Sequence, residues 1–399
     1  MKIVEINAKS IISRMRDGFF AMRYLPFRLT ANIYRGCTHG CVYCYAACTH
    51  YYMRSSPNLF SKEIYVKKNA PEIFEKEIIK YEQRKKKSVI VIGNISDTYQ
   101  PIEIKYRLTR RLLEICYEYN FPCFIETKSP LILNDMDIIE KLAERELIGV
   151  GMTVTSYDDN FTKLVEPFVP RSKFIHSQNR QKERILTLQK LSEIGVDTYL
   201  HITPYFPYIT DKDIDSIIKD AAEAGIGNVI MAPLELSGFI WNRLKKVLAT
   251  SEKYSYLIPL YEKMYFDNGR KLGARITTSE KNHYMLEKKV SELCKKYGIG
   301  YWAFTNPQFN TATISGAYKL RYPILLDYWK LALENGELRL KDVLQFAINY
   351  PVDKKYLSTL KEYFLSGKLF EGVYGIRKIV KNGEVVYVST CRRKKKGIR

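Results

Sequence analysis

Short runs of β-branched residues alternate with amphipathic helical stretches through the middle of the chain. Six such runs predict strands, at residues 28–34, 88–93, 122–127, 148–154, 197–203 and 228–232. Helical patterns separate them at about residues 70–86, 105–119, 136–145 and 211–224, with another in which Ile185, Leu188, Leu191 and Ile194 recur before Gly195. A strand followed by a helix, repeated in this way, is typical of βα units around a parallel sheet or barrel.

The pattern changes after Pro233. Residues 250–306 predict two long helices and a short strand near 300–304, and residues 306–316, rich in Asn, Thr, Ser and Gly, predict a linker. Beyond it, Asn382 and Gly383 predict a hairpin turn, and residues 392–396 form a basic tail. We therefore predict an N-terminal extension (1–24), a barrel domain (25–307) and a small basic accessory domain of helices and strands (308–399).

The length and apolar content suit a folded protein that works in solution. A chain of 399 residues with 46% hydrophobic residues can bury a large core and a smaller appendage. The N-terminus lacks the layout of a signal peptide, and no apolar run reaches the roughly 20 residues that span a bilayer. We expect a cytoplasmic protein without membrane contact.

The charge balance is strongly basic. The chain has 64 Lys and Arg against 43 Asp and Glu, a formal net charge of +21. Such a charge attracts polyanions, so DNA or RNA is a possible partner. A lysine-rich genome or a hot habitat produces the same composition, and charge alone does not distinguish these explanations.

Cysteines provide the first sign of chemistry. In a reducing compartment the eight cysteines are poor candidates for disulfides, so a close group of them indicates metal binding or catalysis. Cys116, Cys123, Cys294 and Cys391 are scattered singly, as small buried hydrophobic residues are. The other four lie between residues 37 and 48.

Cys37, Cys41 and Cys44 have the spacing Cys-x3-Cys-x2-Cys, directly after the first predicted strand. Three thiolates can hold three irons of a [4Fe–4S] cluster and leave the fourth iron free to chelate the amino and carboxylate groups of S-adenosylmethionine (SAM). Zinc is the alternative, because His39, His50 or Cys48 could supply a fourth ligand. The aromatic Tyr43 before the last cysteine favours the cluster.

With this motif the chain resembles the radical SAM superfamily, and within it the group related to spore photoproduct lyase that is labelled DNA repair photolyase-like. Four further segments follow the group's order, at residues 93–103, 126–133, 153–156 with Glu166 and Pro167 after it, and 201–204. The resemblance covers about residues 25–306 and implies an α/β fold, a partial (β/α)6 barrel that is open on one side. The C-terminal α+β domain lies outside it.

The resemblance also implies which residues hold the cofactors. The cluster ligands would be Cys37, Cys41 and Cys44, and the residues that hold SAM would be Ser96, Asp97, Lys128, Thr155 and Ser156, with Tyr43 packed against the adenine. Each SAM residue also has a structural interpretation: a helix cap for Asp97, a surface position for Lys128, a strand end for Thr155 and Ser156. Glu166 and Arg184 match the group too, and an ion pair between them would explain both.

The implied function is reductive cleavage of SAM to a 5′-deoxyadenosyl radical that abstracts hydrogen from a large substrate, with nucleic acid favoured. An external donor of the flavodoxin or ferredoxin type would supply the electron. The alternatives are a radical SAM enzyme acting on a peptide or small metabolite, and a non-catalytic, metal-stabilised nucleic-acid-binding protein.

One departure from the family concerns the hydrogen-atom donor. Spore photoproduct lyase uses a cysteine at a position that falls here on Asn94 or Ile95, and neither carries a thiol. We therefore do not expect this chain to split the thymine dimer photoproduct itself. Cys48, near the cysteine loop, is the one candidate catalytic thiol.

Overall fold

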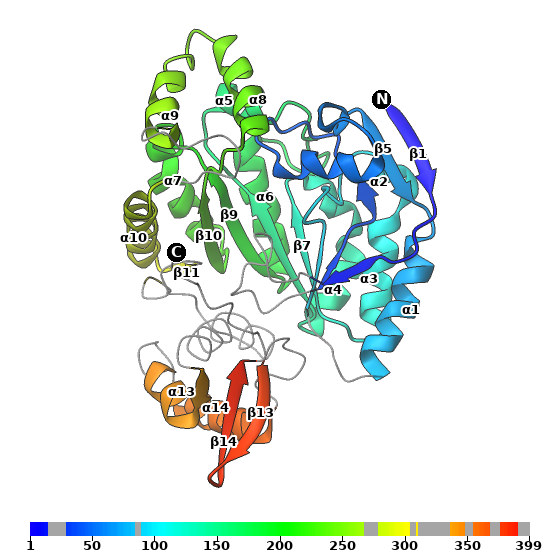
Figure 1. The fold of residues 1–399 in the computed structure, drawn as a ribbon, viewed down its shortest axis with the longest axis vertical. Coiled ribbons are helices and arrows are strands. Elements are labelled where there is room, and N and C mark those ends of the chain that lie inside the picture. Colours follow the sequence, from blue (N-terminus) through cyan, green and yellow to red (C-terminus); the bar gives the residue numbers. More distant parts are fainter. Residues whose placement is uncertain are drawn as a thin grey trace, which may run out of the picture.

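The largest feature of the computed structural model, which describes residues 1–14, 29–83, 89–266, 278–303, 309, 336–347, 354–367 and 376–389, is a sheet of eight strands (Figure 1). In chain order these are β2 (Ile12–Arg14), β3 (Leu29–Ala31), β6 (Ile90–Ile92), β7 (Cys123–Thr127), β8 (Ile148–Thr153), β9 (Asp197–Tyr205), β10 (Asn228–Pro233) and β11 (Gly300–Trp302). The spatial order β11-β10-β9-β8-β7-β6-β3-β2 does not close, and every neighbouring pair is parallel except β2 with β3. This confirms the predicted partial barrel.

Each of the six predicted strands overlaps an observed strand. Within a strand, alternate residues face two different environments. In β8, Val150 and Met152 join the core beneath the helices, and Gly149 and Gly151 occupy the positions between them. Side chains of a strand point alternately to opposite faces, so the two glycines face the inside of the barrel.

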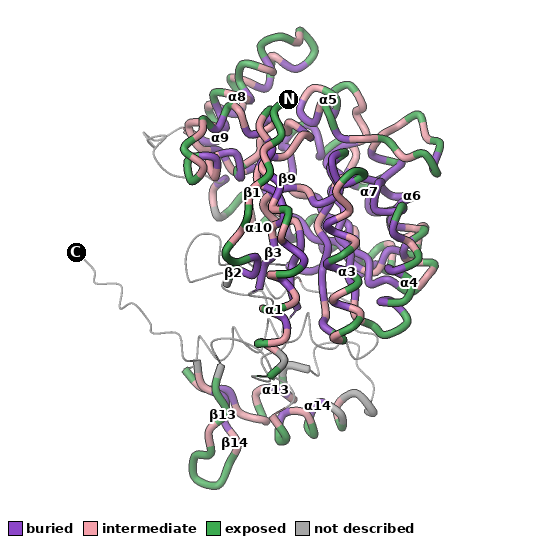
Figure 2. Tube along the Cα trace, turned by 90° about the vertical axis from the view of Figure 1, so that its right-hand side faces the viewer, coloured by how far each residue is buried: buried purple, intermediate pink, exposed green. Residues whose placement is uncertain are grey.

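Helices cover the outer face of the sheet (Figure 1). In chain order, the described helices up to residue 303 are α1 (Ala70–Gln83), α2 (Glu103–Tyr106), α3 (Leu108–Glu118), α4 (Met136–Glu144), α5 (Asp159–Val165), α6 (Arg180–Glu193), α7 (Thr210–Glu223), α8 (Gly238–Ala249), α9 (Leu257–Phe266) and α10 (Glu280–Tyr297), with the short 3-10 helices η1 (Tyr45–Met53), η2 (Pro57–Leu59) and η3 (Pro130–Asp135). Apolar residues of α1, α3, α4, α6, α7 and α10 form one buried core with the strands (Figure 2). No helix in the described part of the chain combines the length and apolarity required to cross a membrane.

Three helical regions differ from the sequence-based prediction, and the first is α5, which has no counterpart among the predicted helices. The predicted helix at 105–119 is divided, because Arg107 adopts a left-handed conformation with φ of 53° between α2 and α3. Helix α8 was not predicted; Ser237 caps it by accepting a hydrogen bond from the Ile240 amide at 3.3 Å. It packs with α5 and α9 in a second apolar cluster. The two helices and the strand predicted for residues 250–306 are confirmed as α9, α10 and β11.

The N-terminal residues contribute strands to two sheets. β1 (Lys2–Ile6) runs parallel to β5 (Glu63–Lys67), which pairs antiparallel with β4 (Tyr34–Arg35) in a separate three-stranded sheet. β2 joins the edge of the main sheet. Residues 15–24 of the predicted extension lie outside the described residues.

A third sheet lies near the C-terminus, formed by β12 (Glu337–Arg339), β13 (Ile376–Lys381) and β14 (Glu384–Ser389), with α13 (Leu340–Ala347) and α14 (Lys354–Ser366) beside it in sequence. The hairpin between β13 and β14 confirms the predicted turn, with φ of 52° at Asn382 and 79° at Gly383. Apart from Phe309, the predicted linker at 306–316 lies outside the described residues, as do Cys391 and the basic tail. The division at residue 308 stays a prediction.

Candidate active site

The cysteine loop, residues 36–44, lies between β4 and η1 and is held by backbone hydrogen bonds to distant segments. The Cys37 amide donates to the Phe60 carbonyl at 2.9 Å and the Val42 amide to the Val165 carbonyl at 2.9 Å. Cys37, Cys41 and Cys44 are free thiols. The loop therefore presents three thiols from a backbone that the rest of the fold fixes in place.

Burial raises the pKa of all three thiols. It raises the pKa of Cys41 to about 12, against the opposing charge of Lys128, and it raises those of Cys37 and Cys44 as well. The thiols are therefore protonated in the metal-free protein. Metal binding would displace these protons, since the thiolate is the ligand form.

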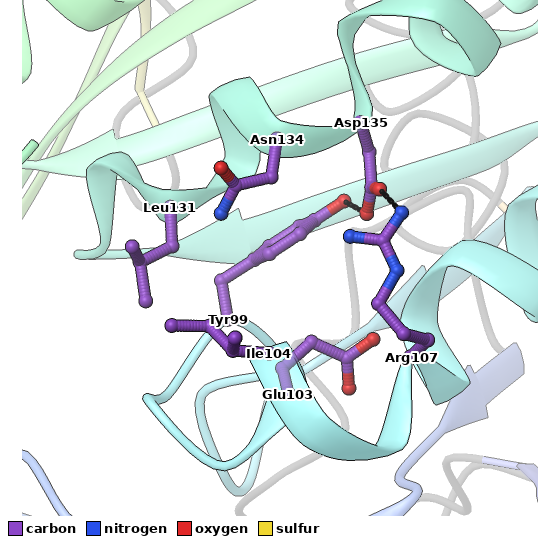
Figure 3. A pocket seen from close by; sticks show the side chains of 7 residues that line it. All are labelled: Tyr99, Glu103, Ile104, Arg107, Leu131, Asn134 and Asp135. Carbon is purple, nitrogen blue, oxygen red and sulfur yellow. Dashed lines mark hydrogen bonds and ion pairs between the residues drawn. The ribbon is translucent and has the colours of Figure 1, made fainter. Parts of the chain in front are cut away.

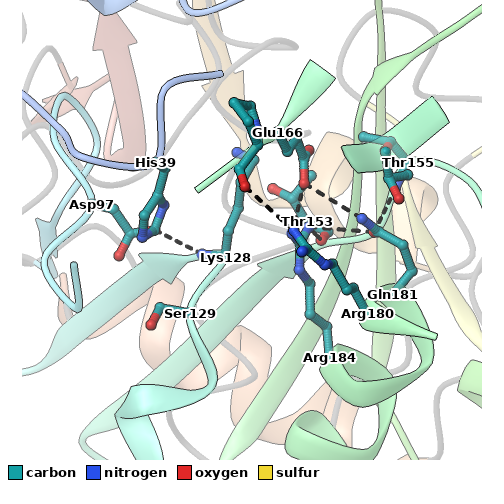
Figure 4. A network of polar contacts seen from close by, with 12 residues as sticks. His39, Asp97, Lys128, Ser129, Thr153, Thr155, Glu166, Arg180, Gln181 and Arg184 are labelled. Carbon is teal, nitrogen blue, oxygen red and sulfur yellow. Dashed lines mark hydrogen bonds and ion pairs between the residues drawn. The ribbon is translucent and has the colours of Figure 1, made fainter. Parts of the chain in front are cut away.

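Asp97, in the loop after β6, connects the cysteine loop to β7. Its carboxylate accepts hydrogen bonds from the Thr127 hydroxyl at 2.7 Å and from the Lys128 amide at 2.8 Å. His39 Nδ1 lies 3.4 Å from its Oδ2 atom (Figure 4). Both carboxylate oxygens are thus bonded to the protein, and one of them faces a histidine of the cysteine loop.

Lys128 follows β7 and extends into the centre of the site (Figure 4). Its Nζ atom lies 5.7 Å from the centroid of the Tyr43 ring. Burial lowers the pKa of Lys128, but Cys41 and Glu166 outweigh that effect, so the net pKa is raised. The site therefore contains a firmly protonated amine close to the cysteine loop.

Glu166 and Arg184 form an ion pair, as their match to the family pattern suggested. Arg184 Nη2 donates to Glu166 Oε2 at 2.6 Å, and Tyr43 donates its hydroxyl hydrogen to the other oxygen of Glu166. Burial raises the pKa of Glu166, but Arg184 and Lys128 outweigh that effect, so the net pKa lies below the usual value. Arg184 also donates to the Thr153 carbonyl at 2.8 Å (Figure 4). The pair links the cysteine loop, β8 and α6.

Thr155 and Ser156, after β8, differ in what their hydroxyls do. Ser156 donates to Asp213 Oδ2 at 2.5 Å, at the start of α7. The Thr155 hydroxyl is buried and has no hydrogen-bond partner among the described residues. The two neighbours are therefore unequal candidates for binding a ligand.

Ser96 Oγ and His39 Nε2 are likewise buried without a partner in the described part of the chain. Unpaired buried polar atoms are costly, so they commonly indicate a bound ligand or water. With the three thiols and Lys128, they provide thiolates for iron, a cation and hydroxyls for a carboxylate, and an acceptor for an amine. The residues present fit a [4Fe–4S] cluster with SAM.

The zinc alternative fits less well. His50 Nε2 lies 3.2 Å from the Glu63 carbonyl oxygen, and His39 Nδ1 lies 3.4 Å from Asp97 Oδ2, so both candidate histidines already have protein partners. Among the residues that the structure describes, no three His, Cys, Asp or Glu side chains converge as ligands of one ion would. A cluster distributes its thiolates over different irons. Cys48 lies within η1, partly exposed, as a free thiol.

Sequence reasoning missed several polar groups of the site. From the sequence, His39 is a candidate only for zinc binding, although it lies within the cysteine motif. Its pairing with Asp97 depends on the tertiary structure. Gln181, which bonds Glu166 at 3.4 Å, and Glu126 and His201, which face the barrel interior, were not selected. Glu126 and His201 lie on β7 and β9 in segments that resemble the family, and this position could have identified them from the sequence.

A pocket on another part of the barrel wall contains no predicted site residue (Figure 3). It lies between α2 and η3 and is lined by Tyr99, Glu103, Ile104, Arg107, Leu131, Asn134 and Asp135. Arg107 pairs with Asp135 at 2.8 Å, and the Tyr99 hydroxyl donates to the same residue at 3.1 Å. Arg107 and Asp135 bond each other and Glu103 bonds Tyr34 and Thr109, as in a structural contact.

The sequence comparisons identify relatives of the chain and a matching family model. The family model of the radical SAM superfamily matches residues 31–221. An uncharacterized protein of Methanocaldococcus jannaschii is 32% identical over 216 residues, which are 53% of this chain and 71% of that protein. An uncharacterized protein of Mycobacterium tuberculosis is 26% identical over 298 residues, 74% of this chain and 81% of that protein.

The structural comparison identifies the fold. A structure of spore photoproduct lyase has a TM-score of 0.56 at 14% identity and covers 75% of this chain and 80% of its own. Another structure of that enzyme contains SAM and a dinucleoside spore photoproduct. The chain therefore belongs to the radical SAM superfamily, as a radical SAM enzyme that uses a [4Fe–4S] cluster and SAM and has the fold of spore photoproduct lyase.

Proposed function

We propose that Cys37, Cys41 and Cys44 hold the [4Fe–4S] cluster and that Ser96, Lys128 and Thr155 contact SAM. This proposal is supported by the buried hydroxyls of Ser96 and Thr155, which have no hydrogen-bond partner among the described residues, and by the protonated Lys128 between them in the sequence. Asp97, Tyr43 and Ser156 have their polar atoms bonded within the protein, so we assign them to the wall of the site.

When bound, the cofactors would supply one reaction, in which an electron from the cluster would cleave SAM into methionine and a 5′-deoxyadenosyl radical able to abstract hydrogen from the substrate. The residues of this chain hold the reactants and exclude water. The Glu166–Arg184 pair is buried, and Lys128 is a partly exposed, protonated amine beside it in the site. A flavodoxin- or ferredoxin-type protein supplies the electron.

We further propose that the substrate is a nucleic acid, because exposed aromatic and cationic side chains flank the cysteine loop. Tyr51 and Tyr52, on η1, are 68% and 80% exposed, and Phe168 beside the loop is 65% exposed. Arg35 lies 5.8 Å from the centroid of the Tyr52 ring, and Arg54 is exposed at the end of η1. Stacking rings with neighbouring cations are what single-stranded nucleic acids bind.

The helix η1, which carries Tyr51 and Tyr52, is also held firmly, as a binding surface requires. His50 is fully buried, and its ring packs edge-on against Phe60 and Tyr65 with centroids 5.0 and 5.7 Å apart. η1 is thereby anchored on its inner side, and the adjacent tyrosines project on its outer side. With the net charge of +21, this surface favours a polyanion over a peptide or small metabolite.

The first test is SAM cleavage. The protein would be reconstituted with iron and sulfide without oxygen, reduced with dithionite, and assayed for 5′-deoxyadenosine with and without DNA and tRNA. We expect product from the wild type, more of it with a nucleic acid, and none from Cys41→Ala. A fully loaded, reduced cluster that yields no product with any nucleic acid would refute the assignment.

The substrate class has its own test in binding of single-stranded oligonucleotides. The double variant Tyr51→Ala/Tyr52→Ala should bind about tenfold or more weakly, because each lost base stack costs about 1–3 kcal/mol. Tyr256→Ala is the control, since Tyr256 is a 42% exposed tyrosine just before α9 and is not part of η1. Equal loss in both would contradict a specific binding surface on η1.

A further inference from the structure

The inside of the barrel contains polar groups that the cofactor site does not use. On β7 the inward positions are Phe124 and Glu126, since Cys123 and Ile125 belong to the core beneath the helices. Glu126 is in register with Gly151 of β8. On β9 the inward positions include Tyr199 and His201, since Leu200 and Ile202 face the same outer core.

Gly151 makes room for His201. A β-carbon at residue 151 would lie 2.4 Å from His201 Nε2 and 2.5 Å from Cε1, far inside contact distance. Only a glycine allows the imidazole to lie across β8. The ring nitrogen thereby reaches the backbone position that is in register with Glu126.

The Nε2 atom of His201 is buried and has no hydrogen-bond partner among the described residues. Burial, and then Lys128, lowers the pKa of His201 to about 3, so the ring is neutral. A neutral imidazole can donate or accept one hydrogen bond at Nε2, depending on its tautomer.

Glu126 is also unpaired within the described residues, and it is partly exposed. Burial raises its pKa to about 7, against the effect of Lys128. Near neutral pH the carboxyl group is therefore protonated in a large fraction of molecules. In that form it both donates and accepts a hydrogen bond.

Aromatic rings surround these two groups. The Phe124 ring is stacked on His201, with centroids 6.1 Å apart and 14° between the planes. Tyr199 meets the edge of Phe124 at 5.3 Å and lies 6.0 Å from Trp302 of β11. The interior thus combines flat apolar surfaces with two groups for which the described residues provide no hydrogen-bond partner.

We propose that Glu126 and His201 bind the edge of one unstacked nucleobase of the substrate inside the barrel. An unpaired carboxyl beside a neutral imidazole disfavours a phosphate or carboxylate and suits a neutral group that carries a donor and an acceptor on one edge. The aromatic surroundings suit a planar ring. This inference rests on the proposed nucleic-acid substrate and assigns the site that would select the base.

The experiment uses the cluster-loaded protein with SAM, unreduced, and a single-stranded thymidine oligonucleotide carrying one 2-aminopurine, whose fluorescence depends on stacking. We expect the wild type to bind the oligonucleotide and change the fluorescence. Glu126→Met nearly keeps the side-chain volume, His201→Phe keeps a flat aromatic ring, and both remove the hydrogen bonds. Each should weaken binding about tenfold, for about 1.4 kcal/mol, and reduce the fluorescence change.

Gly151→Ala provides a variant that leaves both side chains intact. The added methyl group must displace the imidazole, so we expect the same loss as in His201→Phe. The affinity of all three variants for SAM should stay within about twofold of the wild type. Circular dichroism would identify a variant that fails to fold. The other two variants would then test the proposal.

The outcomes separate the two proposals. If the three variants bind the oligonucleotide and change its fluorescence like the wild type, the base site is wrong and the nucleic-acid substrate stands. If the variants lose affinity for SAM equally, Glu126 and His201 belong to the cofactor site and the inference is overturned. If the wild type binds no oligonucleotide, the proposed substrate class is wrong, and the base site is refuted with it.

Discussion

Gly36 lies where the chain passes too close to a neighbouring strand for a side chain. Its φ is +90°, and a β-carbon there would be 2.3 Å from the Glu63 carbonyl oxygen. We expect Gly36→Ala to displace the adjoining cysteine loop and reduce the iron and sulfide bound after reconstitution by at least half. The measurement is iron and sulfide per chain.

Gly195 supplies the control for this substitution. It follows α6 with φ of +82°, and nothing lies within 4 Å of a β-carbon built there. Gly195→Ala therefore costs only the backbone strain of about 1–2 kcal/mol and should bind iron normally. Equal iron loss in the two variants would show that a left-handed glycine as such, and not the position of Gly36, is responsible.

Glu103 makes the stability of the fold depend on pH. Its carboxylate accepts hydrogen bonds from the Tyr34 hydroxyl and from the Thr109 amide, the latter at 2.6 Å. Burial nevertheless raises its pKa from 4.5 to about 7. The folded protein keeps this proton over a range where the unfolded chain has lost it, so stability falls as the pH rises from about 4.5 to 7.

We expect this single group to remove about 3 kcal/mol of unfolding free energy across that range. Glu103→Gln cannot ionise and should lack this component, while the other carboxyls, Glu126 among them, act in both proteins. Urea unfolding of wild type and variant at pH 5 and pH 7.5 measures the difference. Parallel pH profiles would mean that Glu103 ionises normally in the folded protein.

At the scale of elements, α6 presents Gln181 and Arg184 to Glu166, and its first turn is set by Asn179. The Asn179 side chain accepts from the Gln181 amide at 2.8 Å and donates to the Tyr157 carbonyl at 2.8 Å. We expect Asn179→Ala to cost about 1–2 kcal/mol of stability and to weaken SAM binding severalfold, because the helix start shifts. Thermal unfolding and equilibrium binding of SAM measure the two effects.

Ser279→Ala is the matched loss of a helix cap. Ser279 caps α10 by accepting from the Asn282 amide at 3.2 Å, and α10 carries none of the proposed SAM residues. It should cost similar stability and leave SAM affinity unchanged. If both variants bound SAM equally well, α6 would have no role in positioning the ligand beyond its packing.

At the scale of the whole molecule, the net charge of +21 predicts binding that depends steeply on salt. Each cation that contacts a phosphate of a single strand contributes roughly 0.7 to the slope of log K against log salt concentration. Removing the basic tail at residues 392–396 should lower that slope and weaken binding to all sequences alike. Titrations at several salt concentrations test this, and an unchanged slope would exclude the tail from the interface.

Much of this protein could be predicted from local patterns. The six strands, the helices between them, the hairpin at Asn382 and the spacing of Cys37, Cys41 and Cys44 all depend on residues close together in the chain. Hydrophobic periodicity reports which side of an element is buried, and a short ligand motif needs no distant partner to be recognised. The partial barrel followed from these elements and the family resemblance.

Other features needed contacts between segments far apart. The break at Arg107, the β1-β5-β4 sheet and the pairing of His39 with Asp97 have no local signature. Whether a polar side chain is free to bind a ligand depends on its neighbours in space: Ser156 meets Asp213 of another helix, whereas Thr155 meets no described partner. Residue type supplies a group's chemistry, and burial with its tertiary partners decides whether that chemistry remains available.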